Sequence, residues 1–138
     1  MPVVLAVAWG SARSVDDESK HVNAKVLIVD DHADFRSTAR LLLESEGFEV
    51  VGEAPDGKSA LLAAALLKPD VILLDVNLPD LDGFAVAERI CASGAAATVV
   101  LTSSRSPADF GPLVGRCGAQ GFIAKDDLSG AALIAMLP

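Results

Sequence analysis

The sequence predicts an α/β domain built on a parallel β-sheet. From Lys25 onward, short apolar runs alternate about five times with segments of helical pattern, which is typical of βαβ units. The runs 26–29 and 71–74 are continuously apolar rather than alternating, as expected of central strands covered on both faces. With 138 residues and 51% hydrophobic content, the chain is long enough for one core and too short for a second full domain.

The predicted elements follow one another regularly. We expect strands over residues 25–30, 49–53, 70–75, 97–102 and 120–124. We expect helices over residues 34–46, 57–67, 83–92, 107–116 and 128–137. Asp34 is placed to cap the first helix and Gly47 to end it, while Asp56 opens the second helix and Pro69 follows it.

The fourth helix, 107–116, has the weakest pattern. Gly111, Pro112 and Gly115 lie inside it, and proline removes a helix hydrogen bond while glycine costs conformational entropy. We expect this helix to be short, broken or mobile. Our further expectation is that it gains order when the protein is activated.

Residues 1–24 lie outside the alternating pattern. The apolar stretch 2–9 lacks a basic segment before it and is too short to span a bilayer. The stretch 10–24 is polar and rich in turn formers. We therefore expect residues 1–24 to be an N-terminal extension outside the fold and residues 25–138 to be the domain. An alternative is that residues 3–7 add an edge strand or pack on a neighbour.

Composition narrows the class of protein. The 11 Lys and Arg residues against 19 Asp and Glu residues give a net charge of -8, which argues against direct nucleic-acid binding. The two cysteines, Cys91 and Cys117, form no CxxC pair and have no histidine at metal spacing, so neither a disulfide framework nor a zinc site is indicated. We expect a cytoplasmic protein with reduced cysteines and no membrane partner.

Acidic residues end two of the predicted central strands. Asp30 and Asp31 follow the first strand, and Asp75 ends the third. The carboxyl ends of neighbouring parallel strands meet at one edge, and like charges that close raise each other's pKa unless a cation joins them. The sequence therefore implies a divalent metal. Thr102 and Lys125 end the fourth and fifth strands, and a hydroxyl and an ammonium beside these carboxylates suit a phosphate group.

Four sequence blocks resemble one known family. They are Val-Asp30-Asp31-His, Leu-Asp75-Val-Asn77-Leu-Pro79-Asp-Leu-Asp82-Gly83, Leu-Thr102-Ser103 and Gly-Phe122-Ile-Ala-Lys125. In this order, they resemble the response regulator receiver domain of two-component signalling, from about Lys25 to the C-terminus. The resemblance implies a flavodoxin-like, doubly wound sheet of five parallel strands in the order 2-1-3-4-5, with helices on both faces.

The resemblance also assigns roles to the acidic residues. Asp75 matches the aspartate that takes a phosphoryl group from a sensor histidine kinase. Asp31 would bind Mg²⁺ directly and Asp30 directly or through water. Asp75 and the backbone carbonyl of Asn77 would complete the protein's ligands, with water filling the octahedral positions that Mg²⁺ requires.

Two further residues would respond to the phosphoryl group. Lys125 would pair with one phosphoryl oxygen and Thr102 would donate a hydrogen bond to another. In the family this threonine then moves inward, and the aromatic residue of the fifth strand, here Phe122, turns toward the space it leaves. The resemblance therefore implies a signalling module that supports its own aspartyl phosphorylation and dephosphorylation, rather than an enzyme.

Partners are implied by the same resemblance. Family members dimerise or touch an effector through the fourth helix, the fifth strand and the fifth helix. Asp126 directly follows Lys125, a junction that resembles the subgroup whose receivers usually precede a helix-turn-helix DNA-binding domain. An output domain or effector would lie outside the 138 residues.

Other interpretations remain open from the sequence. A phosphohydrolase of the haloacid dehalogenase type also uses a strand-end aspartate with Mg²⁺, but it needs a second carboxylate where this chain has Asn77, which cannot transfer that proton. A receiver-like module that never takes phosphate is a third possibility. Asp30 could instead cap the first helix, and Gly83 could serve only the turn after the third strand. We expect His32 to line the pocket rim rather than to bind metal.

Overall fold

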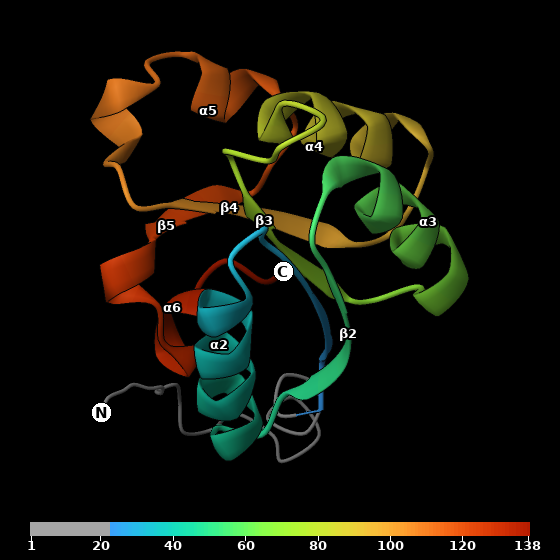
Figure 1. The fold of residues 1–138 in the computed structure, drawn as a ribbon, viewed down its shortest axis with the longest axis vertical. Coiled ribbons are helices and arrows are strands. Elements are labelled where there is room, and N and C mark those ends of the chain that lie inside the picture. The colour runs from blue at the N-terminus through green and yellow to red at the C-terminus, as the bar shows by residue number, and fades with distance from the viewer. Residues whose placement is uncertain (1–22) are drawn as a thin grey trace.

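The fold is an open sheet of five parallel strands in the order β2-β1-β3-β4-β5 (Figure 1). The computed structural model describes residues 23–138, so the extension predicted over 1–24, with its alternative strand over 3–7, lies outside the described residues except at Asn23 and Ala24. The strands are β1 (Lys25–Val29), β2 (Glu49–Ala54), β3 (Val71–Asp75), β4 (Thr98–Ser103) and β5 (Gly121–Ala124). The predicted strand order is confirmed, and each strand end lies within one residue of its predicted position.

Helices connect successive strands. They are α2 (Ala33–Ser45), α3 (Gly57–Leu67), α4 (Gly83–Ala92), α5 (Leu113–Arg116) and α6 (Gly130–Ile134). Helices α3 and α4 have the predicted bounds. Helix α6 is shorter than the predicted 128–137 at both ends. It begins after Ser129, which caps it by accepting a hydrogen bond from the amide of Ala132, and it ends at Ile134.

The fourth predicted helix is broken, as expected. A 3₁₀ turn covers Pro107–Asp109, and only Leu113–Arg116 is α-helical. Between them Gly111 has a φ of +60°, a left-handed conformation that L side chains rarely adopt. The glycine and proline residues explain why this segment is not one continuous helix. The expected mobility of the segment stays a prediction.

Helix ends are only partly as predicted. Asp56 caps α3 through a 2.8 Å hydrogen bond from the amide of Ser59, and Gly47 follows α2 with a φ of +97°. The predicted capping by Asp34 is wrong. His32 occupies the N-cap position of α2 without making a side-chain cap hydrogen bond, and Asp34 lies in the first turn.

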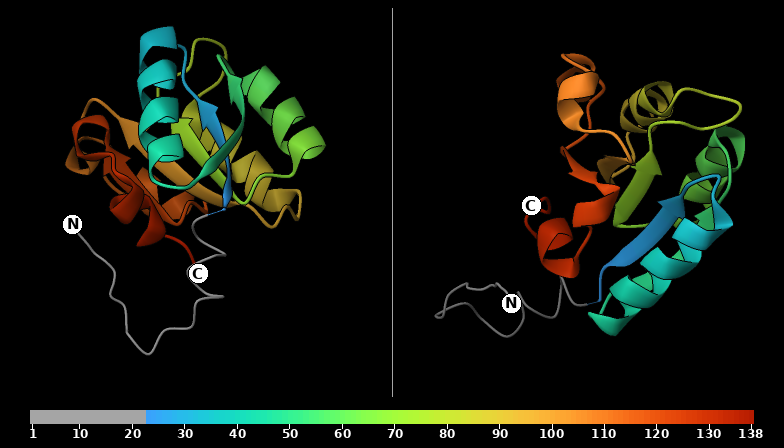
Figure 2. Two further views of the ribbon diagram at one scale, coloured as in Figure 1. Left: turned by 90° about the horizontal axis from the view of Figure 1, so that it is seen from below. Right: turned by 60° about the vertical axis from the view of Figure 1, so that its left-hand side comes forward.

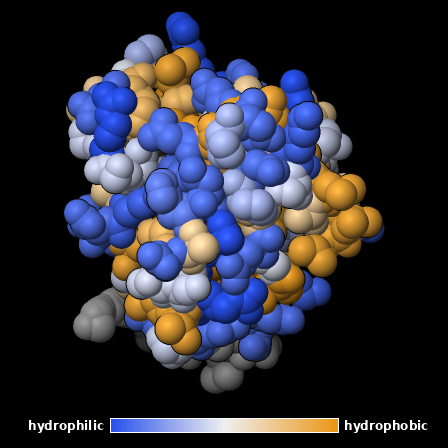
Figure 3. Space-filling view, in the orientation of Figure 1, coloured by the Kyte–Doolittle hydropathy of each residue, from blue (hydrophilic) through white to orange (hydrophobic). Residues whose placement is uncertain are grey.

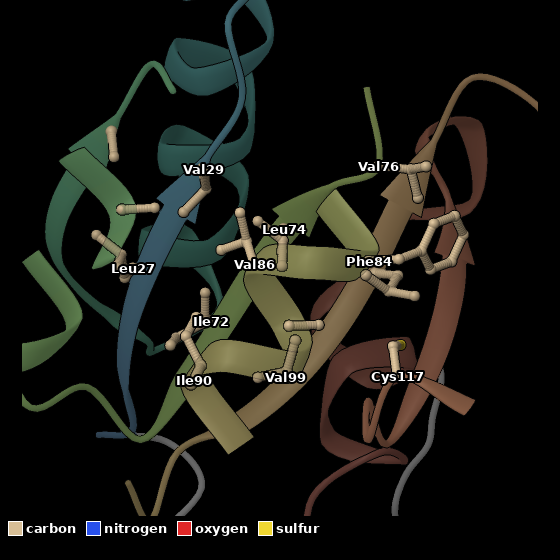
Figure 4. Packing of buried hydrophobic residues seen from close by; sticks show 14 residues of the cluster. Leu27, Val29, Ile72, Leu74, Val76, Phe84, Val86, Ile90, Val99 and Cys117 are labelled. Carbon is tan, nitrogen blue, oxygen red and sulfur yellow. The ribbon is translucent and has the colours of Figure 1, made fainter. Parts of the chain in front are cut away.

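Helices cover both faces of the sheet (Figure 2), and an apolar cluster fills the space on each side. On one face, α2 and α6 contribute Ala39, Leu43 and Leu133. On the other, β1 and β3 side chains meet those of α4, and Figure 4 shows Leu74 and Ile72 close to Val86 and Ile90. Every residue of β3 is buried, which explains its continuously apolar sequence.

Helix α3 shows an apolar surface. Leu62, Leu66 and Leu67 are exposed there, two of them by more than half, and Figure 3 shows apolar side chains over this part of the molecule. Lys58 is the helix's only charged residue. Among the described residues, no helix combines the length and apolar character needed to cross a membrane.

Candidate functional site at the carboxyl edge of the sheet

The sheet register lines up the polar residues at one edge. Val29 pairs with Leu74, so the residues that follow, Asp30 and Asp75, leave the two strands side by side. Asp75 in turn pairs with Thr102. Ser103 pairs with Ala124, the residue before Lys125. Because the four strands are parallel and neighbouring, their carboxyl ends bring two carboxylates, a hydroxyl and an ammonium to one edge.

Asp30 is fixed by its backbone and its neighbours. The residue has no exposed surface, and its amide donates a 3.0 Å hydrogen bond to the carbonyl of Ala54 in β2. Its Oδ1 accepts a 2.8 Å hydrogen bond from the amide of His32. Arg36 donates from Nη1 to the Asp30 carbonyl at 2.6 Å. Asp30 thus makes a local turn before α2 and does not cap the helix, because the N-cap position belongs to His32, while its Oδ2 faces another partner.

That partner is Lys125, which lies in the 3₁₀ turn Lys125–Asp127 after β5. Its Nζ is 2.7 Å from Asp30 Oδ2 and 3.7 Å from Asp75 Oδ2. The contact with Asp30 is an ion pair at an angle that does not make a hydrogen bond. Nζ also lies 4.6 Å from the centre of the Phe35 ring, which favours the ammonium in this position.

Asp75 is nearly buried and its acidity is weakened. Burial raises the pKa of its carboxyl from 3.8 to about 6, and the neighbouring Asp30 carboxylate acts in the same direction. The Lys125 ammonium and the amide of Asn77, which donates to Asp75 Oδ1 at 3.3 Å, oppose this rise in pKa. A further cation at this edge would stabilise the ionised form of the Asp75 carboxyl and lower its pKa.

Thr102 completes the row beside Asp75. Its side chain has no exposed surface, and its Oγ1 has no hydrogen-bond partner among residues 23–138. A buried hydroxyl without a partner costs about 1–3 kcal/mol. The Thr102 hydroxyl is therefore a donor without an acceptor at the edge that carries the carboxylates.

The donor set fits a divalent cation. Asp30, Asp31, His32 and Asp75 each offer one ligand atom, and these four atoms lie within 4.8 Å of one another. Hard cations such as Mg²⁺ take carboxylate oxygens and keep several waters. Three carboxylates, one of them partly exposed at Asp31, match that requirement. The carbonyl of Asn77 stays a predicted ligand, although its residue forms a β-bridge with Asp82 in the same loop.

Gly83 and Asp80 were not recognised in the sequence as site residues. A Cβ on Gly83 would lie 2.6 Å from Val76 Cα and would overlap the carbonyl oxygen of Asp75. Turn chemistry therefore does not fully explain this glycine: it lets α4 approach the backbone of the acidic strand end. Asp80 accepts hydrogen bonds from the amides of Gly57 at 2.7 Å and Lys58 at 3.0 Å, which ties the loop to α3.

Phe122 lies in β5, and β4 separates this strand from β3 and its Asp75. It pairs with Leu101 in the sheet, and its ring centre is 5.9 Å from that of Phe110. Phe110 in turn packs edge-on against Phe84 at 5.5 Å. The predicted switch aromatic is thus part of a row of rings that connects β5 to α4 across the broken segment before α5.

The fold and this acidic edge define a receiver domain of two-component signalling. Residues 26–137 match the profile of the response regulator receiver domain, and the chain belongs to that family. The solved receiver domain of the response regulator NarL from Mycobacterium tuberculosis superposes with a TM-score of 0.74 and is 33% identical, covering 82% of this chain and 94% of that one.

Curated relatives are similar over the same region. The transcription regulator BvgA of Bordetella pertussis is 38% identical over 103 residues, which are 75% of this chain and 49% of the relative. The transcriptional regulatory protein PdtaR of M. tuberculosis is 38% identical over 109 residues, which are 79% of this chain and 53% of the relative. This chain spans about half the length of these relatives.

Proposed function

We propose that Asp75 accepts a phosphoryl group from a sensor histidine kinase, at a Mg²⁺ site made by Asp30, Asp31, Asp75 and the Asn77 carbonyl. An Asp75 oxygen would form the new bond to phosphorus, and the bond to the donor would break. The observation that carries the proposal is the Lys125 ammonium, 2.7 Å from Asp30 and 3.7 Å from Asp75. The Lys125 ammonium would offset the repulsion between the two carboxylates and the negatively charged phosphoryl oxygens.

The remaining residues position the reaction and report it. When bound, the metal would neutralise charge on the transferred group, which is the main requirement of phosphoryl transfer. Thr102, whose hydroxyl is buried and unpartnered among the described residues, would donate to a phosphoryl oxygen. Its inward movement would let Phe122 turn, and the ring row of Phe122, Phe110 and Phe84 would carry the change to α4 and α5.

We infer the surroundings of the module from the same family. It would act in the cytoplasm beside its kinase, with residues 1–24 outside the receiver fold. The face of α5, β5 and α6 would pair with a second copy or an effector. The output would come from a domain or effector beyond the described residues.

The test is phosphate uptake from a small phosphodonor. The intact protein, incubated with Mg²⁺ and acetyl phosphate, should gain the mass of one phosphate, and Asp75→Asn should gain none. Asp109→Asn is the matched control, because Asp109 is a half-exposed aspartate that pairs with Arg105, accepts from the Ser106 amide and does not belong to the acidic cluster. Uptake by Asp75→Asn equal to that of the control would overturn the proposal, and so would no uptake by the unsubstituted protein. Release of more than one phosphate per protein from a generic phosphomonoester, abolished by Asp75→Asn, would instead favour the phosphohydrolase alternative.

A further inference from the structure

His32 lies against the acidic cluster rather than only beside it in sequence. Its Nδ1 is 3.1 Å from Asp30 Oδ1 and 3.1 Å from Asp31 Oδ1. The side chain is 69% exposed, so it is not held there by packing. We propose that His32 binds the pocket's divalent ion through Nδ1, and that the pocket consequently prefers a first-row transition ion such as Mn²⁺ or Co²⁺ to Mg²⁺. This inference rests on the proposed function because it concerns the ion of the same pocket.

The distances from His32 Nδ1 to the carboxylate oxygens of Asp30 and Asp31 match those between adjacent ligands of one metal ion. In an octahedral site with bonds of about 2.1 Å, ligands at right angles are separated by about 3.0 Å. The 3.1 Å separations from Nδ1 to the two carboxylate oxygens match this edge length. The ligand atom of Asp75 lies within 4.8 Å of the other three, somewhat more than the about 4.2 Å between opposite ligands of such a site, so the side chains would close slightly around a single ion.

The backbone explains why the imidazole is available. His32 is the N-cap residue of α2, with φ −92° and ψ 110°, yet its side chain makes no cap hydrogen bond. Its amide donates at 2.8 Å to the same Asp30 Oδ1 that Nδ1 approaches. This tight turn holds the ring over the carboxylates without assigning it a role in the helix.

Ligand chemistry sets the direction of the metal preference. Carboxylate oxygen suits both Mg²⁺ and Mn²⁺, whereas an imidazole nitrogen adds affinity for the first-row transition ions, for Mn²⁺ less than for Co²⁺, and adds little for Mg²⁺. Mg²⁺ would keep a water where a transition ion would take the nitrogen. Loss of the imidazole should therefore weaken binding of Co²⁺ and Mn²⁺ and leave Mg²⁺ nearly unchanged.

A second arrangement would give the same distances. An imidazole with a hydrogen on Nδ1 would instead donate a hydrogen bond to Asp30 Oδ1 and occupy that oxygen in place of the metal. Removing it would then strengthen the binding of every divalent ion, because the carboxylates would lose a competitor. The two arrangements thus predict opposite signs, and metal titration separates them.

The experiment measures metal binding by calorimetry on untagged protein, with MgCl₂, MnCl₂ and CoCl₂ as titrants. His32→Ala should lose about tenfold in affinity for Co²⁺ and Mn²⁺, at the lower end of the loss of about 10–100-fold that follows removal of a residue supporting a metal site, and should change Mg²⁺ affinity less than about twofold. His21→Ala, the same substitution at the chain's other histidine, should match the unsubstituted protein for all three ions. Thermal unfolding of the metal-free variants confirms that each is folded.

Pulsed electron paramagnetic resonance of the Mn²⁺ complex gives a direct readout. Hyperfine coupling to a ligand nitrogen should be present in the unsubstituted protein and in His21→Ala, and absent in His32→Ala. An equal loss for all three ions, tighter Mg²⁺ binding, or no nitrogen coupling would overturn the inference. These outcomes are independent of phosphate uptake on Asp75, so failure of the proposed function would appear separately.

Discussion

Replacing Gly83 by alanine tests whether the acidic strand end is held by close backbone packing. Gly83 opens α4 with an ordinary backbone conformation, where alanine would normally stabilise a helix by about 0.5–1 kcal/mol. Here the new Cβ would overlap the Asp75 carbonyl oxygen and lie 2.6 Å from Val76 Cα. Overpacking costs about 1–3 kcal/mol, and backbone atoms yield less than side chains. We expect a net loss of about 2 kcal/mol.

The assay is urea unfolding followed by circular dichroism, with Gly115→Ala as the matched control. Gly115 lies in α5, and a Cβ there would meet nothing within 4 Å. This variant should unfold at the same urea concentration as the unsubstituted protein or slightly higher. Gly83→Ala should also take up phosphate more slowly, because α4 would displace the backbone of Asp75. A Gly83→Ala protein as stable as the Gly115→Ala control would refute the packing argument.

Three further outcomes follow from the site and its surroundings. Because the pKa of Asp75 is raised to about 6 in the folded protein, the protonated form adds stability that is complete below pH about 4 and lost as pH rises through about 6. In EDTA, the free energy of unfolding should therefore fall by up to about 3 kcal/mol more over this range in the unsubstituted protein than in Asp75→Asn, and parallel curves would contradict the raised pKa. Thr102→Val should be about 1 kcal/mol more stable in urea, because it removes a buried hydroxyl without a partner among the described residues; a destabilised variant would show that the hydroxyl is already satisfied. Hydrogen exchange of residues 107–116 should slow after phosphorylation, and equal protection in both states would count against ordering of this segment.

The strand positions could be predicted because local pattern and global burial agree. Strands β1 and β3 are buried on both faces, so their sequences are apolar without interruption and end abruptly at charged residues. The same abrupt ends place Asp30 and Asp75 at the edge. The broken helix before β5 was also visible, since Gly111 and Pro112 disfavour a helix in any tertiary context.

Features that depend on contacts between distant segments were not visible. Gly83 has the same sequence signature whether it serves a turn or admits the Asp75 carbonyl, and only the approach of α4 to β3 distinguishes the two. Nothing in the sequence distinguishes Arg36 from other helix residues. Its hydrogen bond to the Asp30 carbonyl, at 2.6 Å, arises only because α2 packs beside the end of β1. Asp34 was expected to cap α2 because aspartate is a preferred N-cap residue. The helix instead begins at Ala33, directly after the turn that follows β1, so His32 occupies the N-cap position.

The carboxylates of the site lower the stability of the folded protein when no ion is bound. Asp30 and Asp75 are buried together, and a buried carboxylate is costly unless a cation and hydrogen bonds compensate for lost hydration. Lys125 supplies one charge for two carboxylates, so the ion-free pocket carries an excess of negative charge. An ion that binds only the folded state must then stabilise it, by RT ln(1 + [L]/Kd). Metal binding would therefore relieve the repulsion between the buried carboxylates of Asp30 and Asp75.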